Sequence, residues 1–93
     1  MTSPRYVAVD SVLAGFEQYL ELEQGDDGLW WVTRQVDVHA DGSWRYGRGA
    51  LSEDERGMLS DRPSSDAELA DDEFSTTISG REFEEIWQAA ARL

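Results

Sequence analysis

The chain has 93 residues and a formal net charge of −12, from 20 acidic residues against 8 basic residues, all of them arginine. This charge argues against nucleic acid and anionic membranes as partners, because both are bound through cations, and it favours a basic protein partner. The chain has no cysteine for a disulfide or thiolate site and no long apolar run for a membrane span or secretion signal. We therefore expect a single cytoplasmic domain over residues 1–93.

The first part of the chain predicts two neighbouring antiparallel strands. Residues 5–12 are β-rich and alternate with apolar side chains on both faces, as in a central strand. Residues 16–23 alternate between mostly apolar and mostly acidic side chains, which is typical of a half-exposed antiparallel strand. Residues 24–28 have the composition of a turn and lead into the next strand.

Residues 29–47 predict a long β-hairpin, with strands over 29–39 and 43–47. Alternation gives the first strand two faces. One face is expected to carry Trp30, Val32, Arg34, Val36 and Val38, and the other Trp31, Thr33, Gln35, Asp37 and His39.

Asp41 and Gly42 mark the hairpin turn, and two registers compete there. A two-residue loop of Asp41 and Gly42 pairs Val38 with Arg45. A three-residue loop of residues 40–42 pairs Val38 with Trp44, Val36 with Tyr46 and Asp37 with Arg45. The second register places apolar side chains together and opposite charges together, so it is favoured, with positive φ at Gly42.

Residues 48–77 predict an irregular acidic segment, in which two capping-box patterns indicate short helical turns. The first begins at Ser52 and extends to Leu59. The second follows Pro63, with Ser65 as the cap and Glu68 as the third helical residue. A loop of this length in a small domain indicates function or mobility.

The end of the chain predicts a helix over residues 80–92. Ser79 and Glu82 have capping-box spacing, and Phe83, Ile86 and Trp87 recur on one helical face. The sequence thus predicts an α+β fold, a four-stranded antiparallel β-meander with a C-terminal amphipathic helix packed on one face.

The order and spacing of several short motifs resemble a family of small acidic bacterial domains of unknown function, associated with immunity-type proteins of polymorphic toxin systems. The resemblance covers most of the chain from Tyr19 onward and implies an antiparallel sheet with a C-terminal helix. It implies no catalytic residue. The motifs that carry it are residues 19–23, Trp31 with Arg34, Val36 and Val38, Asp41-Gly42 with Tyr46, Pro63-Ser64, Phe74, Ile78-Ser79, residues 82–84 and Trp87.

Individual residues give few signs of chemistry. Arg34 lies on an apolar strand face, which leaves three alternatives. Its head group reaches the sheet edge, it forms a buried ion pair with an acid such as Glu21, or it has a binding role. His39, the only histidine, lies near a hairpin tip without a nucleophile motif, which favours a surface role. We predict no catalytic residue, no metal site and no cofactor, and hence no enzyme. A hydrolase with paired carboxylates would need a cleft that the sequence does not show.

The functional prediction is an immunity-type protein that binds and neutralises a cognate toxin through an acidic surface. The alternative is a general protein–protein interaction or regulatory module without a toxin partner. The predicted partner is a protein, with a basic toxin domain as the leading candidate. The predicted partner-binding residues are the acids Glu53, Asp54, Glu55, Asp71, Asp72 and Glu73, with Trp31 as an aromatic anchor.

Overall fold

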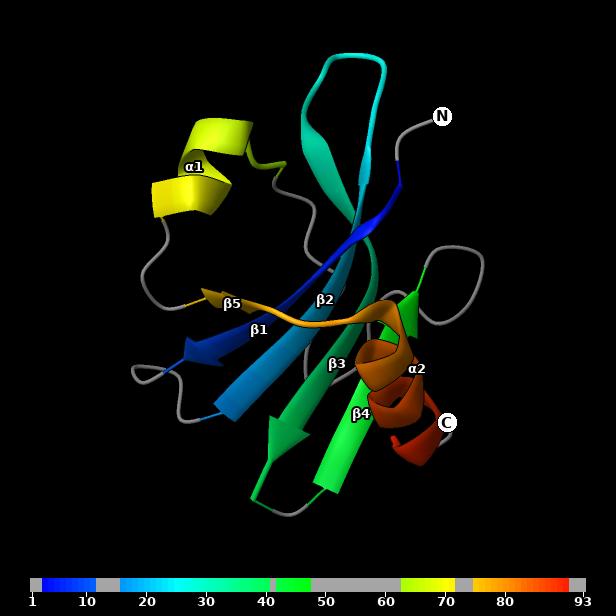
Figure 1. Ribbon diagram of the computed structural model, residues 1–93. Helices are drawn as coiled ribbons and strands as arrows, with labels where there is room; N and C mark the ends of the chain where they lie inside the picture. The colour runs from blue at the N-terminus through cyan, green and yellow to red at the C-terminus, as the bar shows by residue number, and fades with distance from the viewer. Residues whose placement is uncertain (1–2, 12–15, 41, 48–62, 72–74, 91–93) are drawn as a thin grey trace.

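The computed structural model describes residues 3–11, 16–40, 42–47, 63–71 and 75–90. These residues form an α+β fold, with a five-stranded antiparallel sheet and a helix across one face (Figure 1). The strands are β1 (Arg5–Ser11), β2 (Phe16–Gln24), β3 (Trp30–His39), β4 (Gly42–Gly47) and β5 (Ser75–Thr77), in the spatial order β4-β3-β2-β1-β5. The helices are α1 (Asp66–Asp71) and α2 (Gly80–Ala89). The predicted meander of four strands and the predicted C-terminal helix are confirmed.

Strand β5 is an addition that the sequence analysis did not predict, because residues 75–77 fall in the segment expected to be irregular. Thr76 and Thr77 are β-branched and pair with Ala8 and Val7 of β1. The Ile78 amide extends this ladder by donating to the Tyr6 carbonyl at 2.9 Å. The short strand therefore brings the chain to the start of α2 beside β1.

Two of the three helices predicted from capping boxes are present in the described residues. At α1, the Glu68 amide donates to Ser65 Oγ and the Ser65 amide donates to Glu68 Oε1, each at 3.1 Å. At α2, Ser79 is the N-cap and its Oγ accepts from the Glu82 amide at 3.0 Å. The helix ends at Ala89 rather than continuing to residue 92, because Ala90 has an extended backbone, with ψ at 149°. The helix predicted from Ser52 to Leu59 lies outside the described residues.

A β-bulge divides strand β3 into two parts whose side chains alternate differently. The pairing with β2 shifts between Glu21 and Leu22, so that Glu21 pairs with Arg34 but Leu22 pairs with Val32. Because directly paired residues share a face, Trp30 and Val32 lie on the face opposite to Arg34 and Val36. The prediction that these residues share one face is therefore wrong.

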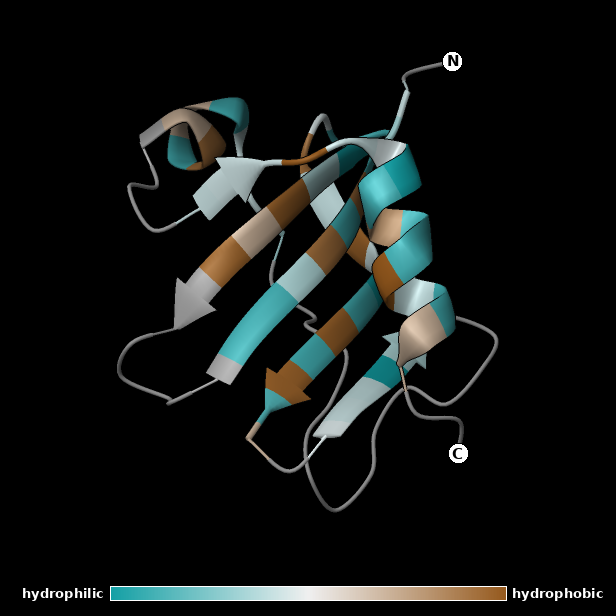
Figure 2. Cartoon of the chain, turned by 60° about the horizontal axis from the view of Figure 1, so that its bottom comes forward, coloured by the Kyte–Doolittle hydropathy of each residue, from teal (hydrophilic) through white to brown (hydrophobic). Residues whose placement is uncertain are grey.

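Apolar and polar residues alternate along the strands (Figure 2), and the strand pairing assigns them to two faces. The face under α2, called the helix face here, carries Tyr6, Tyr19, Glu21, Arg34, Val36 and Arg45, which pair across neighbouring strands. The other, called the reverse face, carries the cluster Val7, Leu22, Trp30 and Val32, with Leu69 of α1 packed against it. The sheet thus has packing partners on both sides.

The register predicted for the hairpin is also wrong. Asp37 pairs with Trp44 and Val36 pairs with Arg45, and the pairing ends at His39 and Gly42. This register buries Val36 under α2 on the helix face, and it buries Trp44 and Tyr46 on the reverse face, with exposed fractions of 0%, 8% and 1%. Both faces bury apolar side chains here, so matching apolar partners on a single face does not identify the register. Gly42 has φ at +152°, as the positive φ prediction required.

Candidate functional site

Most of the predicted partner-binding acids lie outside the described residues. This applies to Glu53, Asp54, Glu55, Asp72 and Glu73, whereas Asp71 is the last residue of α1. Trp31 is in β3 and is half-buried. The candidate site is therefore built from Trp31 and the residues that surround it.

Trp31 lines a groove of about 550 Å³ at the end of the sheet where β2 turns into β3. The other described lining residues are Glu23, Gln24, Gly25 and Thr33. Glu23 pairs directly with Trp31, so an exposed carboxylate lies beside the indole on the same face of the sheet. The groove therefore combines an aromatic surface with a negative charge.

The turn between β2 and β3 fixes one edge of the Trp31 indole. The Gly25 amide donates to the Leu29 carbonyl at 2.8 Å, and Gly28 has φ at +80°, which glycine adopts without strain. Asp27 Oδ1 accepts from the Leu29 amide at 3.0 Å and from Trp31 Nε1 at 3.4 Å. A side chain at Gly25 would meet the indole at 3.2 Å, so glycine permits this approach. The turn thus holds the indole and places a second carboxylate at its Nε1 edge.

Arg34 forms the ion pair with Glu21 that the sequence analysis considered. Arg34 Nη2 donates to Glu21 Oε2 at 2.6 Å and Nε donates to Oε1 at 2.9 Å, which is a bidentate geometry. Arg34 also forms an ion pair with Glu84 of α2. Its guanidinium carbon lies 5.1 Å from the ring centroids of both Phe83 and Trp87. Arg34 therefore joins β2, β3 and α2 through charges and aromatic rings.

The surroundings of Arg34 shift the titration of its neighbours. Hydrogen bonds from Arg34 lower the pKa of the Glu21 carboxyl, against the opposing effect of burial. Hydrogen bonds to Glu21 and Glu84 raise the pKa of Arg34. Burial, followed by the negative charge of Glu21, raises the pKa of the Tyr6 hydroxyl. The pKa shifts of Glu21 and Arg34 therefore both favour the charged forms that make up this ion pair.

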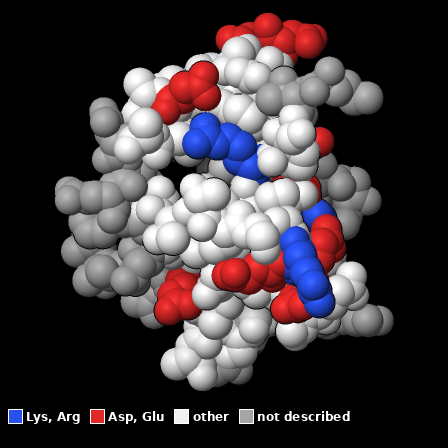
Figure 3. Space-filling view, viewed as in Figure 1, with Lys and Arg blue, Asp and Glu red and all other residues white. Residues whose placement is uncertain are grey.

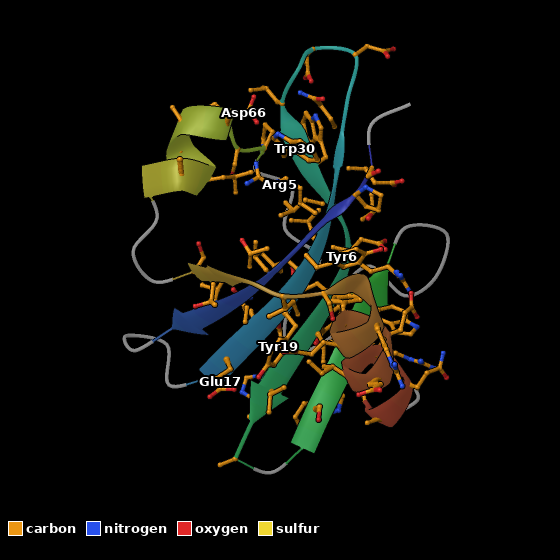
Figure 4. The ribbon with its side chains drawn as sticks, in the orientation of Figure 1. Arg5, Tyr6, Glu17, Tyr19, Trp30 and Asp66 are labelled. Carbon is orange, nitrogen blue, oxygen red and sulfur yellow. The ribbon has the colours of Figure 1, made fainter. Side chains whose placement is uncertain are left out.

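A second arginine cluster attaches α1 to the reverse face (Figure 4). Trp30 Nε1 donates to Asp66 Oδ1 at 2.7 Å, and the Trp30 backbone exchanges hydrogen bonds with Ser64 at 2.8 and 2.9 Å. Arg5 lies 5.2 Å from the Trp30 ring centroid and 3.6 Å from Asp66. The predicted helical turn after Pro63 is thus fixed to the sheet by an indole, an acid and a cation.

Every arginine whose side chain is described contacts another group of the same chain. Arg5 and Arg34 do so in the clusters above, Arg45 donates to the Trp87 carbonyl at 3.1 Å, and Arg81 lies 3.6 Å from Glu85. Figure 3 shows acidic side chains at the β2–β3 turn, near α1 and along α2. The exposed described acids are Glu17, Glu23, Asp26, Asp27, Asp66, Glu68, Glu82, Glu84 and Glu85.

Other candidates for chemistry do not form a site in the described part of the chain. No group of three or more histidine, aspartate or glutamate side chains there could hold a metal ion. His39 is half-buried and lies edge-on to Trp44, with ring centroids 5.5 Å apart. Neither described helix has the length and apolar character of a membrane span.

Asp37 was expected on the polar face of the hairpin, but the structure buries it. Alternation along β3 predicted that Asp37 lies opposite Arg45 on that face, but its side chain has an exposed fraction of 3%. Its Oδ1 accepts from Gln35 Nε2 at 2.9 Å and from Gln18 Nε2 at 3.2 Å. These bonds satisfy a buried carboxylate, as burial of a charge requires.

Glu23 and Asp27 are the site residues that the sequence analysis did not single out. A signal for Glu23 was present, because a β2–β3 hairpin with a turn at residues 24–28 places it near Trp31.

Comparisons with protein-family models, curated proteins and solved structures find no match for this chain. The family resemblance seen in the sequence therefore stays a prediction.

Proposed function

We propose that this chain is an immunity-type protein that neutralises a cognate toxin by binding it through an acidic surface, without catalysis. The observation that carries the proposal is the distribution of charge. The chain has a net charge of −12, and the described arginines contact groups of the same chain while many acids are exposed. The proposal includes the cytoplasmic location that the sequence predicts.

The proposed mechanism is electrostatic steering followed by occlusion of the toxin's active site. An acidic surface raises the rate of encounter with a basic partner, and this effect weakens as salt screens the charges. The groove at Trp31 supplies an aromatic anchor of the kind that contributes strongly to protein interfaces. The acids of residues 53–55 and 71–73 belong to the proposed surface on sequence grounds.

The test begins with affinity capture from the source organism and identification of the captured protein. Binding of that purified protein is then measured against salt for the wild-type chain and for a variant with Glu53→Lys, Asp54→Lys and Glu55→Lys. A matched control reverses three exposed acids outside the Arg34 cluster, Glu17 of β2 and Glu82 and Glu85 of α2. We expect the first variant to lose affinity and salt dependence more than the control.

Co-expression decides whether the partner is a toxin. The captured protein should stop growth when produced alone, and the chain should restore growth when both are produced. Equal affinity and equal salt dependence of all three chains would overturn the acidic-surface mechanism. A captured partner without toxicity would favour the alternative of a general interaction module.

A further inference from the structure

We propose that the groove beside Trp31 accepts an arginine side chain of the partner protein. This inference rests on the proposed function and adds the chemistry of the contact. Its occupant is defined by three features of the groove: an indole, carboxylates beside it, and polar side chains that accept hydrogen bonds. Each feature is supported by a separate observation on the described residues.

The aromatic feature is an indole held in one orientation. The Cδ1 and Nε1 edge of Trp31 lies against the backbone at Gly25, and Nε1 donates to Asp27 Oδ1. A ring fixed at one edge by a turn needs little further ordering when a ligand stacks on it, which lowers the entropic cost of binding.

The charged feature consists of two carboxylates near the indole, of which Glu23 lines the groove and Asp27 lies at the Nε1 edge of the ring. Glu23 is the direct cross-strand partner of Trp31, and Asp27 is bonded to the indole nitrogen. Both carboxylates belong to exposed residues, so a cation that reaches the ring also reaches a negative charge. Gln24 and Thr33, which also line the groove, carry oxygen atoms able to accept from a guanidinium.

The same chain already places arginine in this combination of groups twice. Arg34 lies over Phe83 and Trp87 and binds Glu21 and Glu84. Arg5 lies over Trp30 beside Asp66. In both clusters a guanidinium contacts an aromatic ring and a carboxylate together, and the Trp31 groove presents these two groups again.

Arginine fits this groove better than lysine does. A guanidinium is planar, so it stacks on an indole while its N–H groups bind a carboxylate in the plane. An ammonium is a compact, strongly hydrated charge that cannot make both contacts with the same geometry. The groove should therefore distinguish arginine from lysine at equal charge, which a diffuse acidic surface would not do.

The experiment titrates the isotope-labelled full chain with a capped tetra-arginine peptide and follows amide and indole resonances by NMR. Capped tetra-lysine and tetra-citrulline peptides are the chemical controls. We expect the Trp31 indole N–H and the Gly25 amide to shift most with tetra-arginine, less with tetra-lysine and not with tetra-citrulline. Titration at two salt concentrations measures the electrostatic part.

Two variants of the same strand separate the groove from general acidity. Glu23→Gln removes the carboxylate beside Trp31, whereas Glu17→Gln removes an exposed carboxylate from the same face at the other end of β2. We expect Glu23→Gln to weaken tetra-arginine binding about threefold to fivefold, which is the size of effect typical of one exposed charge pair. We expect Glu17→Gln to weaken it by less than about 1.5-fold, because Glu17 lies away from the groove. Trp31→Leu should also weaken binding and abolish the preference over lysine.

The outcomes separate this inference from the proposed function. Equal losses for the two glutamine variants, or equal binding of arginine and lysine peptides, would overturn the groove while leaving an acidic binding surface in place. Absence of any tetra-arginine shift at Trp31 would also overturn it. Retained tetra-arginine selectivity together with a natural partner that binds independently of charge would overturn the proposed function instead.

Discussion

The two faces of the sheet are held by different kinds of interaction. On the helix face, α2 is attached through Arg34, its carboxylate partners Glu21 and Glu84, and the fully buried ring of Phe83. On the reverse face, the core is an apolar cluster of Val7, Leu22, Trp30 and Val32. The core of the reverse face is stabilised mainly by burial, and its Arg5–Asp66 pair is largely exposed. The helix face depends on paired charges that are more buried and have a defined geometry.

This difference shows what the β-bulge in the β2–β3 pair does. Without the shift between Glu21 and Leu22, Val32 and Arg34 would share a face, and a charge would lie within the apolar cluster. The bulge turns Arg34 toward α2, where carboxylates and rings surround it, and leaves Val32 on the reverse face. The β-bulge thus separates the charged Arg34 cluster on the helix face from the apolar cluster on the reverse face.

The largest expected effect is loss of the buried ring on the helix face. Phe83 is 0% exposed and contacts Tyr6, with ring centroids 5.3 Å apart. We expect Phe83→Ala to reduce the free energy of unfolding by about 3–5 kcal/mol, measured by urea denaturation. Val32→Ala on the reverse face should cost about 2 kcal/mol, because fewer buried atoms are removed. A smaller loss for Phe83→Ala than for Val32→Ala would contradict the proposed role of the ring.

Removing the cation of the helix face should have the next largest effect. Arg34→Met keeps much of the apolar stem but leaves the mostly buried Glu21 carboxylate without its main partner, so we expect a loss of about 2–3 kcal/mol. Arg81→Met is the matched control, because its pair with Glu85 is exposed and should contribute about 0.5 kcal/mol or less. Equal stabilities of these two variants would show that the Arg34 cluster contributes no more to the free energy of unfolding than an exposed ion pair does.

The β3–β4 turn offers a smaller effect. Gly42 has φ at +152°, and a side chain there would meet the Trp44 ring at 3.2 Å. We expect Gly42→Val to cost about 1–3 kcal/mol, read as a lower thermal midpoint in circular dichroism. An unchanged midpoint would mean that the turn accepts a different backbone conformation.

The smallest effect is the pH dependence of the helix face. The pKa of Glu21 is lowered in the folded chain, so its contribution to stability is present above the ordinary glutamate range and is lost as the pH falls through the folded-state pKa. The urea midpoint of the wild type should therefore exceed that of Glu21→Gln at pH 7, and the difference should shrink as the pH falls below about 4.3. A difference that stays constant over this range would exclude ionisation of Glu21 as its cause.

The sequence predicted the elements of this fold better than their relative registers. Both predicted N-caps in the described part of the chain form, because cap residues act on the adjacent backbone. The β2–β3 turn also follows from local composition. These features depend on neighbouring residues, so a single sequence contains enough information to place them.

The features that the sequence did not predict depend on distant residues. The position of the bulge could be predicted only by knowing that Glu84, fifty positions away in the chain, lies on the helix face and pairs with Arg34. The burial of Asp37 follows from amides of Gln18 and Gln35 and from a sheet that packs on both sides. Alternation along one strand assigns its faces but does not show that both faces will be covered.

The candidate site likewise combines a residue that the local sequence identifies with residues that only the strand pairing and the turn bring to it. Trp31 could be selected as an anchor because a large aromatic residue stood among polar neighbours in β3. The contributions of Glu23 and Asp27 depend on strand pairing and on the turn that bonds the indole. Pairing residues across a predicted turn before choosing candidates would have placed Glu23 beside Trp31.

Hydrogen exchange of Arg34→Met, followed by mass spectrometry, tests most directly the claim that charges hold α2 on the sheet while apolar packing holds the core of the reverse face. The account predicts that the amides of α2 exchange at least about tenfold faster than in the wild type, since local opening costs less free energy. Amides of the β1–β2 pair should change much less. Uniform acceleration across both regions, or no change in α2, would contradict the account.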